Sequence, residues 1–267
     1  MRQKRLAILG TGNLARILAQ ELQEEAFSAY RLAVVYGRDP EKAKALAAGA
    51  GAAAVTTLPD LLAQRPEIVL EATTPAHLKS AAPAILRAGC SMIILSAGAL
   101  ADTAFQEELT RAGMESGARL YVASGAVGGF DLLRTAALMG GVTLTVRNRK
   151  PPAAYEGAPF LAGQALAADR ETLLFSGTAA EAIARFPQNV NVAVAAAEAS
   201  IGAARTMVTV ESDPSLELNT HILELRGNFG QATLKIASGA SAKAGSSAMA
   251  AYSVLSLLLQ MTQVIVF

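Results

Sequence analysis

The chain has little cysteine, few aromatic residues and almost no net charge. Its 267 residues include one cysteine, Cys90, two histidines and no tryptophan, and the formal net charge is +1. A single cysteine excludes an internal disulfide framework and a cysteine metal cluster within one chain, and neither histidine has metal-ligand spacing around it. The 23 basic and 22 acidic residues form no basic block, so no electrostatic footprint for nucleic acid is present. We therefore expect neither a metal site nor a nucleic-acid partner.

We expect neither the amino-terminal nor the carboxyl-terminal residues of the sequence to act as a membrane signal. The apolar run after the basic amino-terminal residues is too short for a secretory signal and ends in a glycine turn. The apolar carboxyl-terminal segment is interrupted by polar residues and is shorter than the ~20 apolar residues that a membrane span needs. These polar residues are Ser253, Ser256, Gln260, Thr262 and Gln263. We expect a cytoplasmic protein with no membrane partner, whose last segment forms a buried helix followed by a short strand.

Residues 1–123 alternate short apolar runs with helical stretches. The runs include "RLAILG", "YRLAVVYG", "PEIVLEAT" and "SMIILSAG". Such alternation is typical of β-α-β units around a parallel sheet. The sequence therefore predicts an α/β fold with an amino-terminal, doubly wound dinucleotide-binding domain of the Rossmann type.

The pattern changes after residue 123. Segments rich in β-formers, among them "GGVTLTVRNRK" and "THILELRGNFG", come with two helical stretches around Glu181 and Ala193. This favours an α+β arrangement with a mixed or antiparallel sheet. We expect a substrate domain at residues 124–245, with the helix inside 246–267 packing back on the first domain.

The first predicted strand runs into the turn "GTGNLA", and a helical pattern follows at once. This is the context of the dinucleotide fingerprint. Gly10 allows the tight turn, and Gly12 lets the backbone approach a pyrophosphate. The helix start at Asn13 and Leu14 would offer unpaired N–H groups to the phosphates. The alternative is a merely structural glycine turn.

The end of the second predicted strand bears on the choice between NADP(H) and NAD(H). Gly37 occupies the position where a carboxylate would chelate the ribose 2′-hydroxyl, and Arg38 follows it. A missing carboxylate removes repulsion from a 2′-phosphate, and a guanidinium supplies a bidentate partner for it. NADP(H) is therefore favoured, while NAD(H) remains possible. In the alternative, Asp39 serves as the acid, or Arg38 is only a surface charge.

Small and hydroxylated residues follow the next two strands, where they can line the cofactor crevice at the carboxyl ends of a parallel sheet. They are Ala72, Thr73 and Thr74 after one strand, and Ser96 and Ala97 after the other. We expect these five residues to contribute to cofactor binding.

Two segments of the second domain have binding character. "SGAVGGFD" begins at Ser124, and its stacked glycines can form an anion nest for a substrate carboxylate. A flexible interdomain turn is the alternative. In "RFPQNVNVAVAAAEA", Asn189 or Asn191 is expected to cap the helix that follows.

His221 is the best candidate for proton transfer. Period-two alternation places it with Leu223 and Leu225 on one face of a strand, and an unperturbed imidazole titrates near pH ~6.5. A reaction that uses this imidazole as a base would then become faster as the pH rises through neutrality. A core or hydrogen-bonded surface histidine is the alternative. His77 stands at a helix start, where a solvated or capping role is favoured over catalysis.

The chain resembles the L-aspartate dehydrogenase family over nearly its whole length. The resemblance is carried by "GTGNLA", "EATTPA", "ILSAGALAD", "SGAVGGFDLL", "FPQNVNVA", "DPSLELNTHILEL", "GNFG" and "AYSVL", in family order. It implies a Rossmann domain, a substrate domain, and nicotinamide-dependent oxidation of an amino dicarboxylate to a keto acid and ammonia. It further implies a catalytic role for His221 and substrate-binding roles for Ala126, Val127, Gly128, Gly129 and Asn189.

One segment departs from the family pattern. Before its last helix the family usually shows Asn-Pro-Lys/Arg-Thr-Ser, whereas this chain has Gly245 about where the basic residue is expected. Lys243 is the nearest substitute. Two alternatives stay open: a related dehydrogenase of the homoserine or dihydrodipicolinate type, and a non-catalytic NADP(H)-sensing protein. A homodimer is the expected assembly, because the carboxyl-terminal segment is apolar and the second domain rich in β-structure.

Overall fold

The structure is a computed structural model that describes residues 2–155, 159–161, 163, 165–187, 189–239 and 247–266. The chain divides into two compact units. The first comprises Met1–Ala99, Thr103–Ala123 and Ala248–Phe267, and the second comprises Leu100–Asp102 and Ser124–Ser247.

The first unit is built on a parallel sheet in the order β3-β2-β1-β4-β5-β6. The strands are β1 (Lys4–Leu9), β2 (Tyr30–Tyr36), β3 (Ala53–Val55), β4 (Ile68–Glu71), β5 (Ser91–Ile94) and β6 (Leu120–Val122). Each neighbouring pair is parallel, and the order reverses direction beside β1. The predicted doubly wound sheet is confirmed, and its carboxyl edge at β1 and β4 is where such sheets bind ligands.

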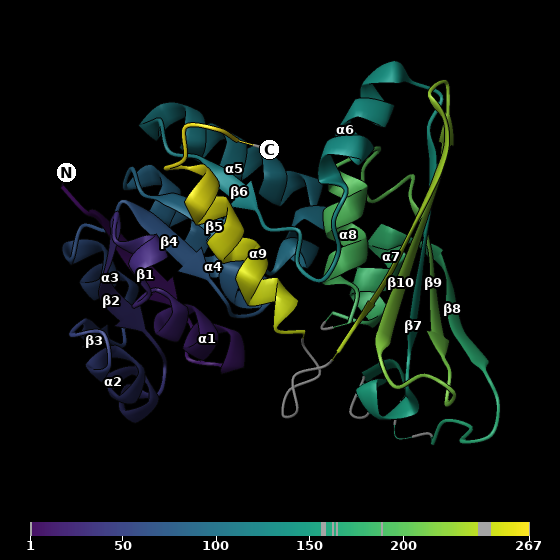
Figure 1. Cartoon of the computed structure of the whole chain (residues 1–267), viewed down its shortest axis with the longest axis horizontal. Helices are drawn as coiled ribbons and strands as arrows, with labels where there is room; N and C mark the ends of the chain where they lie inside the picture. Colours follow the sequence, from purple (N-terminus) through teal and green to yellow (C-terminus); the bar gives the residue numbers. More distant parts are fainter. Residues whose placement is uncertain are drawn as a thin grey trace. The chain divides into compact units, whose positions relative to one another are not determined.

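Helices and short 3₁₀ turns follow these strands, and the last helix of the chain joins them. They are α1 (Asn13–Glu21), α2 (Pro40–Ala48), α3 (Leu58–Ala63), α4 (Pro75–Arg87), α5 (Thr103–Ser116) and α9 (Met249–Gln260), with 3₁₀ turns η1 (Glu25–Phe27) and η2 (Ala97–Ala101). The chain's last helix, α9, lies beside α1 (Figure 1) and shares a core with it. The Tyr30 hydroxyl fixes α9 by donating to the carbonyl of Leu258 at 2.7 Å.

The chain's end differs from the prediction. The expected buried helix is present as α9, but the short strand expected after it is wrong, because residues 262–266 form turns and bends. Val264 is 99% exposed and Ile265 70% exposed. A strand needs a hydrogen-bonded neighbour, and this segment pairs with neither sheet among the described residues.

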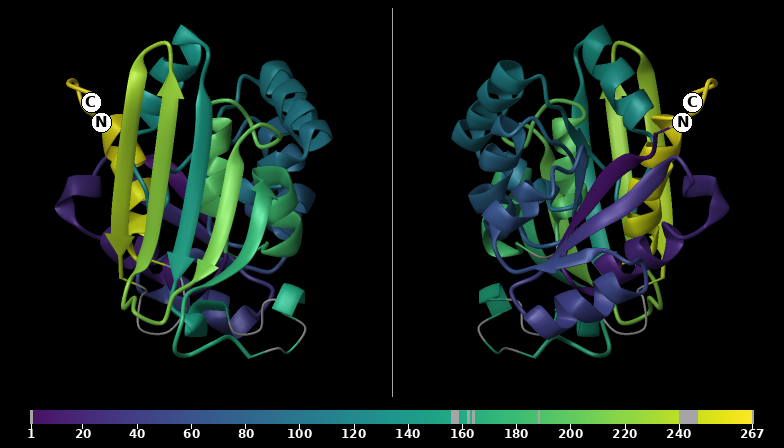
Figure 2. Two further views of the ribbon diagram at one scale, coloured as in Figure 1. Left: turned by 90° about the vertical axis from the view of Figure 1, so that its right-hand side faces the viewer. Right: turned by 90° about the vertical axis from the view of Figure 1, so that its left-hand side faces the viewer.

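The second unit contains a mixed sheet in the order β11-β10-β7-β9-β8. Its strands are β7 (Thr143–Lys150), β8 (Thr172–Thr178), β9 (Met207–Ser212), β10 (Asn219–Gly227) and β11 (Gly230–Ser238). β7 and β9 are parallel and the other pairs are antiparallel, which confirms the predicted mixed sheet. The left view of Figure 2 shows the five strands side by side.

Three helices, α6 (Phe130–Met139), α7 (Ala179–Arg185) and α8 (Asn191–Glu198), cover one face of this sheet (Figure 1). Short 3₁₀ turns η3 (Pro152–Tyr155) and η4 (Pro159–Leu161) follow β7. The sequence reading missed α6 and β8. β8 shows no clean alternation because its register with β9 shifts between Leu173 and Phe175. α6 starts after Gly129 with no side-chain cap to mark it.

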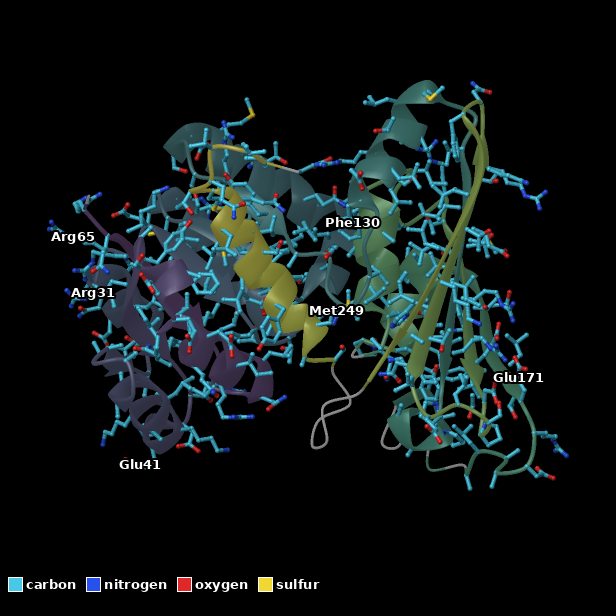
Figure 3. The ribbon with its side chains drawn as sticks, viewed as in Figure 1. Arg31, Glu41, Arg65, Phe130, Glu171 and Met249 are labelled. Carbon is cyan, nitrogen blue, oxygen red and sulfur yellow. The ribbon has the colours of Figure 1, made fainter. Side chains whose placement is uncertain are left out.

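Alternation along β7 and β10 gives the sheet two different faces. On the helix side, Leu144 and Val146 of β7 and Leu223 and Leu225 of β10 are buried in the core. The other face carries ion pairs, including those of Arg149 with Glu171 at 3.0 Å and with Asp213 at 2.7 Å. Glu171 lies on the side of the sheet away from the helices (Figure 3).

The described residues contain neither a membrane-spanning helix nor a cluster of metal-binding side chains. No helix among them has the length and apolar character needed to cross a bilayer. Nor do these residues gather three or more histidine, cysteine, aspartate or glutamate side chains as a metal site would require.

Candidate active site

The β1–α1 turn in the first unit has the shape that a pyrophosphate needs. Gly10 has a φ of +124°, and a Cβ there would overlap the carbonyl oxygen of Ala72. Its N–H donates to the Tyr36 carbonyl at 2.9 Å, which ties the turn to β2. Nothing lies within 4 Å of where a Cβ on Gly12 would stand. α1 starts at Asn13 with no side-chain cap on its N–H groups, so the turn fits an anionic group approaching the backbone.

Several predicted cofactor side chains already have protein partners. Asn13 Oδ1 accepts from Arg16 at 2.9 Å, and Leu14 packs against the core of the first unit. Thr74 caps α4, accepting from the N–H of His77 at 3.3 Å. The side chains of these residues are therefore engaged within the protein, and their backbone is the part left for the predicted cofactor contact.

The sequence reading did not single out Glu71 as a site residue. Its side chain is 0% exposed at the end of β4. It accepts from the N–H and hydroxyl of Thr73 at 2.7 and 2.6 Å. It also accepts from the N–H and hydroxyl of Ser96 at 3.0 and 2.7 Å, and from Leu95 N–H at 3.1 Å. A buried carboxylate is tolerated only when hydrogen-bonded in this way.

Glu71 therefore joins the ends of β4 and β5 and brings two predicted cofactor residues, Thr73 and Ser96, to one place. Ala97 follows as the first residue of η2 and is 1% exposed. The signal that could have found Glu71 is a carboxylate ending an otherwise apolar strand, "EIVLE".

Beyond β2, Gly37 is buried and Arg38 is exposed. Asp39 caps α2 through Oδ1, which accepts from the N–H groups of Lys42 at 3.2 Å and Glu41 at 3.0 Å. These bonds lower the pKa of Asp39. The reading of Asp39 as the ribose ligand is weakened, because one of its oxygens already serves the helix.

His77 has a more specific environment than the expected solvated one. Its ring stacks on Tyr36, with ring centroids 5.5 Å apart. Its pKa is lowered, first by burial and then by the positive charge of Arg38. Its Nε2 is buried and has no hydrogen-bond partner among the described residues. The predicted place at a helix start is correct, because α4 begins two residues earlier at Pro75, but the N-cap is Thr74 and His77 caps nothing there; it only donates its backbone N–H to Thr74.

In the second unit, His221 lies on β10 opposite Asn148 of β7. The imidazole is 3% exposed, and its Nδ1 lies 2.8 Å from Asn148 Oδ1. Asn148 Nδ2 is directed to the carbonyl of Thr209 at 3.5 Å, which leaves Oδ1 facing the ring. Since Oδ1 only accepts, Nδ1 carries the hydrogen and Nε2 keeps a lone pair.

The expected pKa of His221, near ~6.5, is wrong. Burial, and secondly the positive charge of Lys150, lower the pKa of His221 to about 3. Because desolvation disfavours the charged imidazolium, the ring stays neutral across the physiological range. It therefore keeps a lone pair at Nε2 throughout this range rather than changing its charge near neutrality.

Lys150 is the main site residue that the sequence reading missed. It ends β7, is 5% exposed and donates to the backbone and side-chain oxygens of Asn189, each at 3.2 Å. Its ammonium lies 5.8 Å from the ring centre of Tyr155. Burial lowers the pKa of Lys150 to about 8. The alternation of β7, which buries every second residue up to position 150, could have found it.

Ser212 lies next to Lys150 in the β7–β9 register. It is 0% exposed, and its Oγ has no hydrogen-bond partner among the described residues. A buried hydroxyl without a partner is uncommon in folded proteins. Together with the buried ammonium of Lys150, it is suited to an anionic ligand.

The predicted helix cap at Asn189 or Asn191 is wrong. α8 starts at Asn191 with Val190 as its N-cap, and no side-chain cap hydrogen bond is made. The side chain of Asn189 instead accepts from Lys150. Asn189 binds the buried ammonium of Lys150 instead of the helix N–H groups, because a charge-assisted hydrogen bond is stronger than a bond to a neutral N–H.

The segment "SGAVGGFD" combines buried side chains with an open backbone. Val127 is 1% exposed and Ala126 is 7% exposed. Gly125 and Gly129 have φ angles of +67° and +77°, and no atom lies within 4 Å of where a Cβ on Gly128 would stand. The two apolar side chains anchor the turn, so a ligand would meet its backbone. Lys243 and Gly245, named above for the departure from the family pattern, lie outside the described residues.

The sheet order and glycine turn of the first unit define a dinucleotide-binding domain of the Rossmann type, and the family models place it in a dehydrogenase. Residues 10–123 match the family model "Homoserine dehydrogenase, NAD binding domain", and residues 131–261 match "Aspartate dehydrogenase, C-terminal".

Individual relatives extend this match. The chain is 37% identical over 257 residues to L-aspartate dehydrogenase 2 of Bordetella pertussis, with 94% of each chain covered. It is 40% identical over 173 residues to L-aspartate dehydrogenase of Methanosarcina mazei, covering 64% of each. Aspartate dehydrogenase from Thermotoga maritima has a similar crystal structure, with a TM-score of 0.77 and 26% identity over 100% of both chains. The chain belongs to the L-aspartate dehydrogenase family, which confirms the resemblance found in the sequence.

Proposed function

We propose that the chain oxidises L-aspartate with a nicotinamide cofactor to iminosuccinate, which water converts to oxaloacetate and ammonia, and that it also runs the reverse reductive amination. The observation that carries the proposal is the pairing of a neutral imidazole, His221, with a buried ammonium, Lys150, on one face of the second unit's sheet. Membership of the family supports it.

The first unit would hold the cofactor. The turn at Gly10 and Gly12 and the start of α1 would receive the pyrophosphate through backbone N–H groups. Thr73 and Ser96, whose positions Glu71 fixes, would present backbone along the crevice. When bound, the cofactor supplies the two-electron acceptor for the hydrogen on the substrate's α-carbon.

The second unit would hold the substrate by its carboxylates. One carboxylate would bind the ammonium of Lys150 and the hydroxyl of Ser212, which has no hydrogen-bond partner in the part of the chain that the structure describes. The other would take backbone N–H groups of the glycine turn at Gly128, where no atom lies within 4 Å of a Cβ position, whereas Leu234 fills that space at Gly129. Lys150 would therefore supply a cation for the dicarboxylate, although the sequence has Gly245 about where the family pattern has a basic residue.

His221 would move the protons. After oxidation, water adds to the iminium carbon, and Nε2 of His221 accepts the proton that this water loses. The same proton then passes to the departing nitrogen, and as the carbinolamine collapses its hydroxyl proton returns to Nε2 and leaves with the ammonia, so that the products are oxaloacetate and ammonium. Asn148 would keep the hydrogen on Nδ1 throughout, because its Oδ1 lies 2.8 Å from that atom.

We propose NADP(H) as the preferred cofactor and NAD(H) as a weaker one. The absence of a side chain at Gly37 and the exposed guanidinium of Arg38 support this preference, as does the use of Asp39 Oδ1 as a helix cap. A 2′-phosphate would meet the cation of Arg38 and no carboxylate at position 37.

We also propose that the protein works in the cytoplasm as a homodimer. The buried free thiol of Cys90 suits a reducing compartment, and light scattering would report the mass of the assembly.

A substrate screen in both directions tests the proposal. L-Aspartate is offered with NADP⁺ or NAD⁺, and oxaloacetate with ammonia is offered with NADPH or NADH. Homoserine and other amino acids serve as comparison substrates. We expect turnover with aspartate and oxaloacetate, faster with NADP(H). Turnover with homoserine but not aspartate would assign the chain to another reaction, and tight NADPH binding without any turnover would make it a sensor.

A further inference from the structure

Thr11 and Gly37 are in direct contact in the first unit, although they lie in different turns. A Cβ built on Gly37 would overlap the γ-methyl carbon of Thr11. It would also meet Thr11 Oγ1 and Ala43 Cβ, each at 3.4 Å. The side chain of Thr11 therefore fills the space that any side chain at position 37 would need.

The backbone around this contact is held in place. The N–H of Gly10, next to Thr11, donates to the Tyr36 carbonyl at 2.9 Å, and the N–H of Gly37 donates to the Val55 carbonyl at 3.1 Å. Ala43, which borders the same space from α2, is 0% exposed. Neither turn can move away without breaking a strand-end hydrogen bond, so a larger side chain at either position requires a smaller one at the other.

We propose that Thr11 and Gly37 act as a pair that determines cofactor selectivity. The γ-methyl group of Thr11 excludes a side chain, and hence a carboxylate, from position 37. The end of β2 is then left to a ribose 2′-phosphate, with Arg38 as its cation. The inference rests on the proposed preference for NADP(H) and assigns the cause of that preference to a steric contact inside the fingerprint turn.

The pairing has a consequence that a single substitution would not reveal. Placing an aspartate at position 37 alone would supply the carboxylate that a ribose 2′-hydroxyl needs, but its Cβ would collide with Thr11. The turn would be displaced, and binding of both cofactors would suffer. NAD(H) preference would require the γ-methyl of Thr11 to be removed as well.

The experiment compares Gly37→Asp alone with two double variants, Thr11→Ser with Gly37→Asp and Thr11→Val with Gly37→Asp. Serine removes only the γ-methyl group of Thr11, whereas valine keeps it, so the valine double variant is the matched steric control. Thr11→Ser alone shows the effect of removing the γ-methyl group while position 37 is still glycine. For each full-length protein, Tm is measured by thermal unfolding and the Kd for NADPH and NADH by fluorescence titration.

We expect Gly37→Asp to lower Tm and to weaken both cofactors. Thr11→Ser should restore Tm in the double variant and tighten NADH binding by about tenfold or more over the valine double variant, the size expected for hydrogen bonds to a charged group. A Gly37→Asp protein with unchanged Tm and NADH binding as tight as that of the serine double variant would overturn the inference. Wild-type protein that binds NADH as tightly as NADPH would instead refute the proposed cofactor preference, while the Tm values would still report the steric coupling.

Discussion

Nδ1 of His221 and Oδ1 of Asn148 lie 2.8 Å apart on neighbouring antiparallel strands. The amide oxygen cannot donate, so this contact places the ring hydrogen on Nδ1 and the lone pair on Nε2. The same amide is neutral, so it orients the ring without stabilising the imidazolium. A carboxylate in its place would do both.

Asn148→Asp should therefore change the pH dependence of the reaction. A carboxylate beside Nδ1 would raise the pKa of His221 from the value of about 3 that burial and Lys150 produce. As the pH is lowered, kcat/KM for aspartate should begin to fall at a higher pH in the variant than in the wild type. The reason is that a protonated Nε2 cannot accept another proton. Profiles of kcat/KM from pH 5 to 9, which report free-enzyme pKa values, test this. Superimposable acid limbs would show that Asn148 does not control the ring's charge.

Lys150 should make dicarboxylate binding sensitive to alkaline pH. The lowered pKa of Lys150, about 8, means that its positive charge is present below that pH and is lost as the pH rises through it. The inhibition constant of succinate, which lacks the reacting amine, should therefore rise above about pH 8. Lys150→Met should weaken succinate about 10- to 100-fold at neutral pH, the size of a lost charged hydrogen bond, with little change in Kd for the cofactor.

Two controls accompany that measurement. Lys150→Arg keeps its charge to much higher pH, so any succinate binding that it retains should lose its alkaline dependence. The thermal stability of Lys150→Met at neutral pH should not fall below that of the wild type by more than a few degrees, because removing a buried charge relieves a desolvation cost. A Lys150→Met protein that is stable and binds succinate normally would remove Lys150 from the substrate site.

Glu71→Gln should damage the cofactor end of the first unit. The carboxylate accepts five hydrogen bonds from Thr73, Leu95 and Ser96, and an amide would set one of its own donors against them. We expect a loss of about 2 to 4 kcal/mol in the free energy of unfolding, typical of a disrupted buried polar network, and weaker NADPH binding. The matched control is Glu41→Gln on α2, where an exposed ion pair with Lys44 contributes little. Equal stability of the two variants would show that Glu71 has no organising role.

The fold was predictable from the sequence because alternation is local. Apolar runs interleaved with helical stretches indicated the parallel sheet, and β-rich segments indicated the mixed one. β8 was missed where a register shift between Leu173 and Phe175 breaks the alternation. The carboxyl-terminal strand was predicted wrongly, because apolar composition says nothing about whether a pairing partner exists.

The chemistry of the site was less predictable than the fold. His221 could be singled out, but not its pKa, because the groups that set it come from distant parts of the chain. Asn148 stands 73 residues before it, and Lys150 enters the same buried face only through the pairing of β7 with β10. The role of Glu71 could not be predicted for the same reason. Its burial depends on donors that follow another strand, up to 25 residues away.

Acid should destabilise the protein through His221. In the unfolded chain the imidazole binds a proton below pH ~6.5, whereas the folded ring resists protonation down to about pH 3. The unfolded state therefore binds more protons between these values, and stability falls as the pH falls through that window. The contribution is about 5 kcal/mol when complete, from the size of the shift. Unfolding free energies of wild type and His221→Gln at pH 7.5 and pH 4.5 test it. An equal loss in both proteins would mean that other groups account for the acid sensitivity.

The most direct test of the whole account is kcat for L-aspartate oxidation by His221→Ala, measured with the Kd for NADPH on the same preparation. The account predicts a kcat about 10²- to 10⁴-fold below wild type, the range for loss of a general base, with NADPH bound as tightly as before. A variant that binds NADPH normally and turns over aspartate at the wild-type rate would contradict the role assigned to the imidazole.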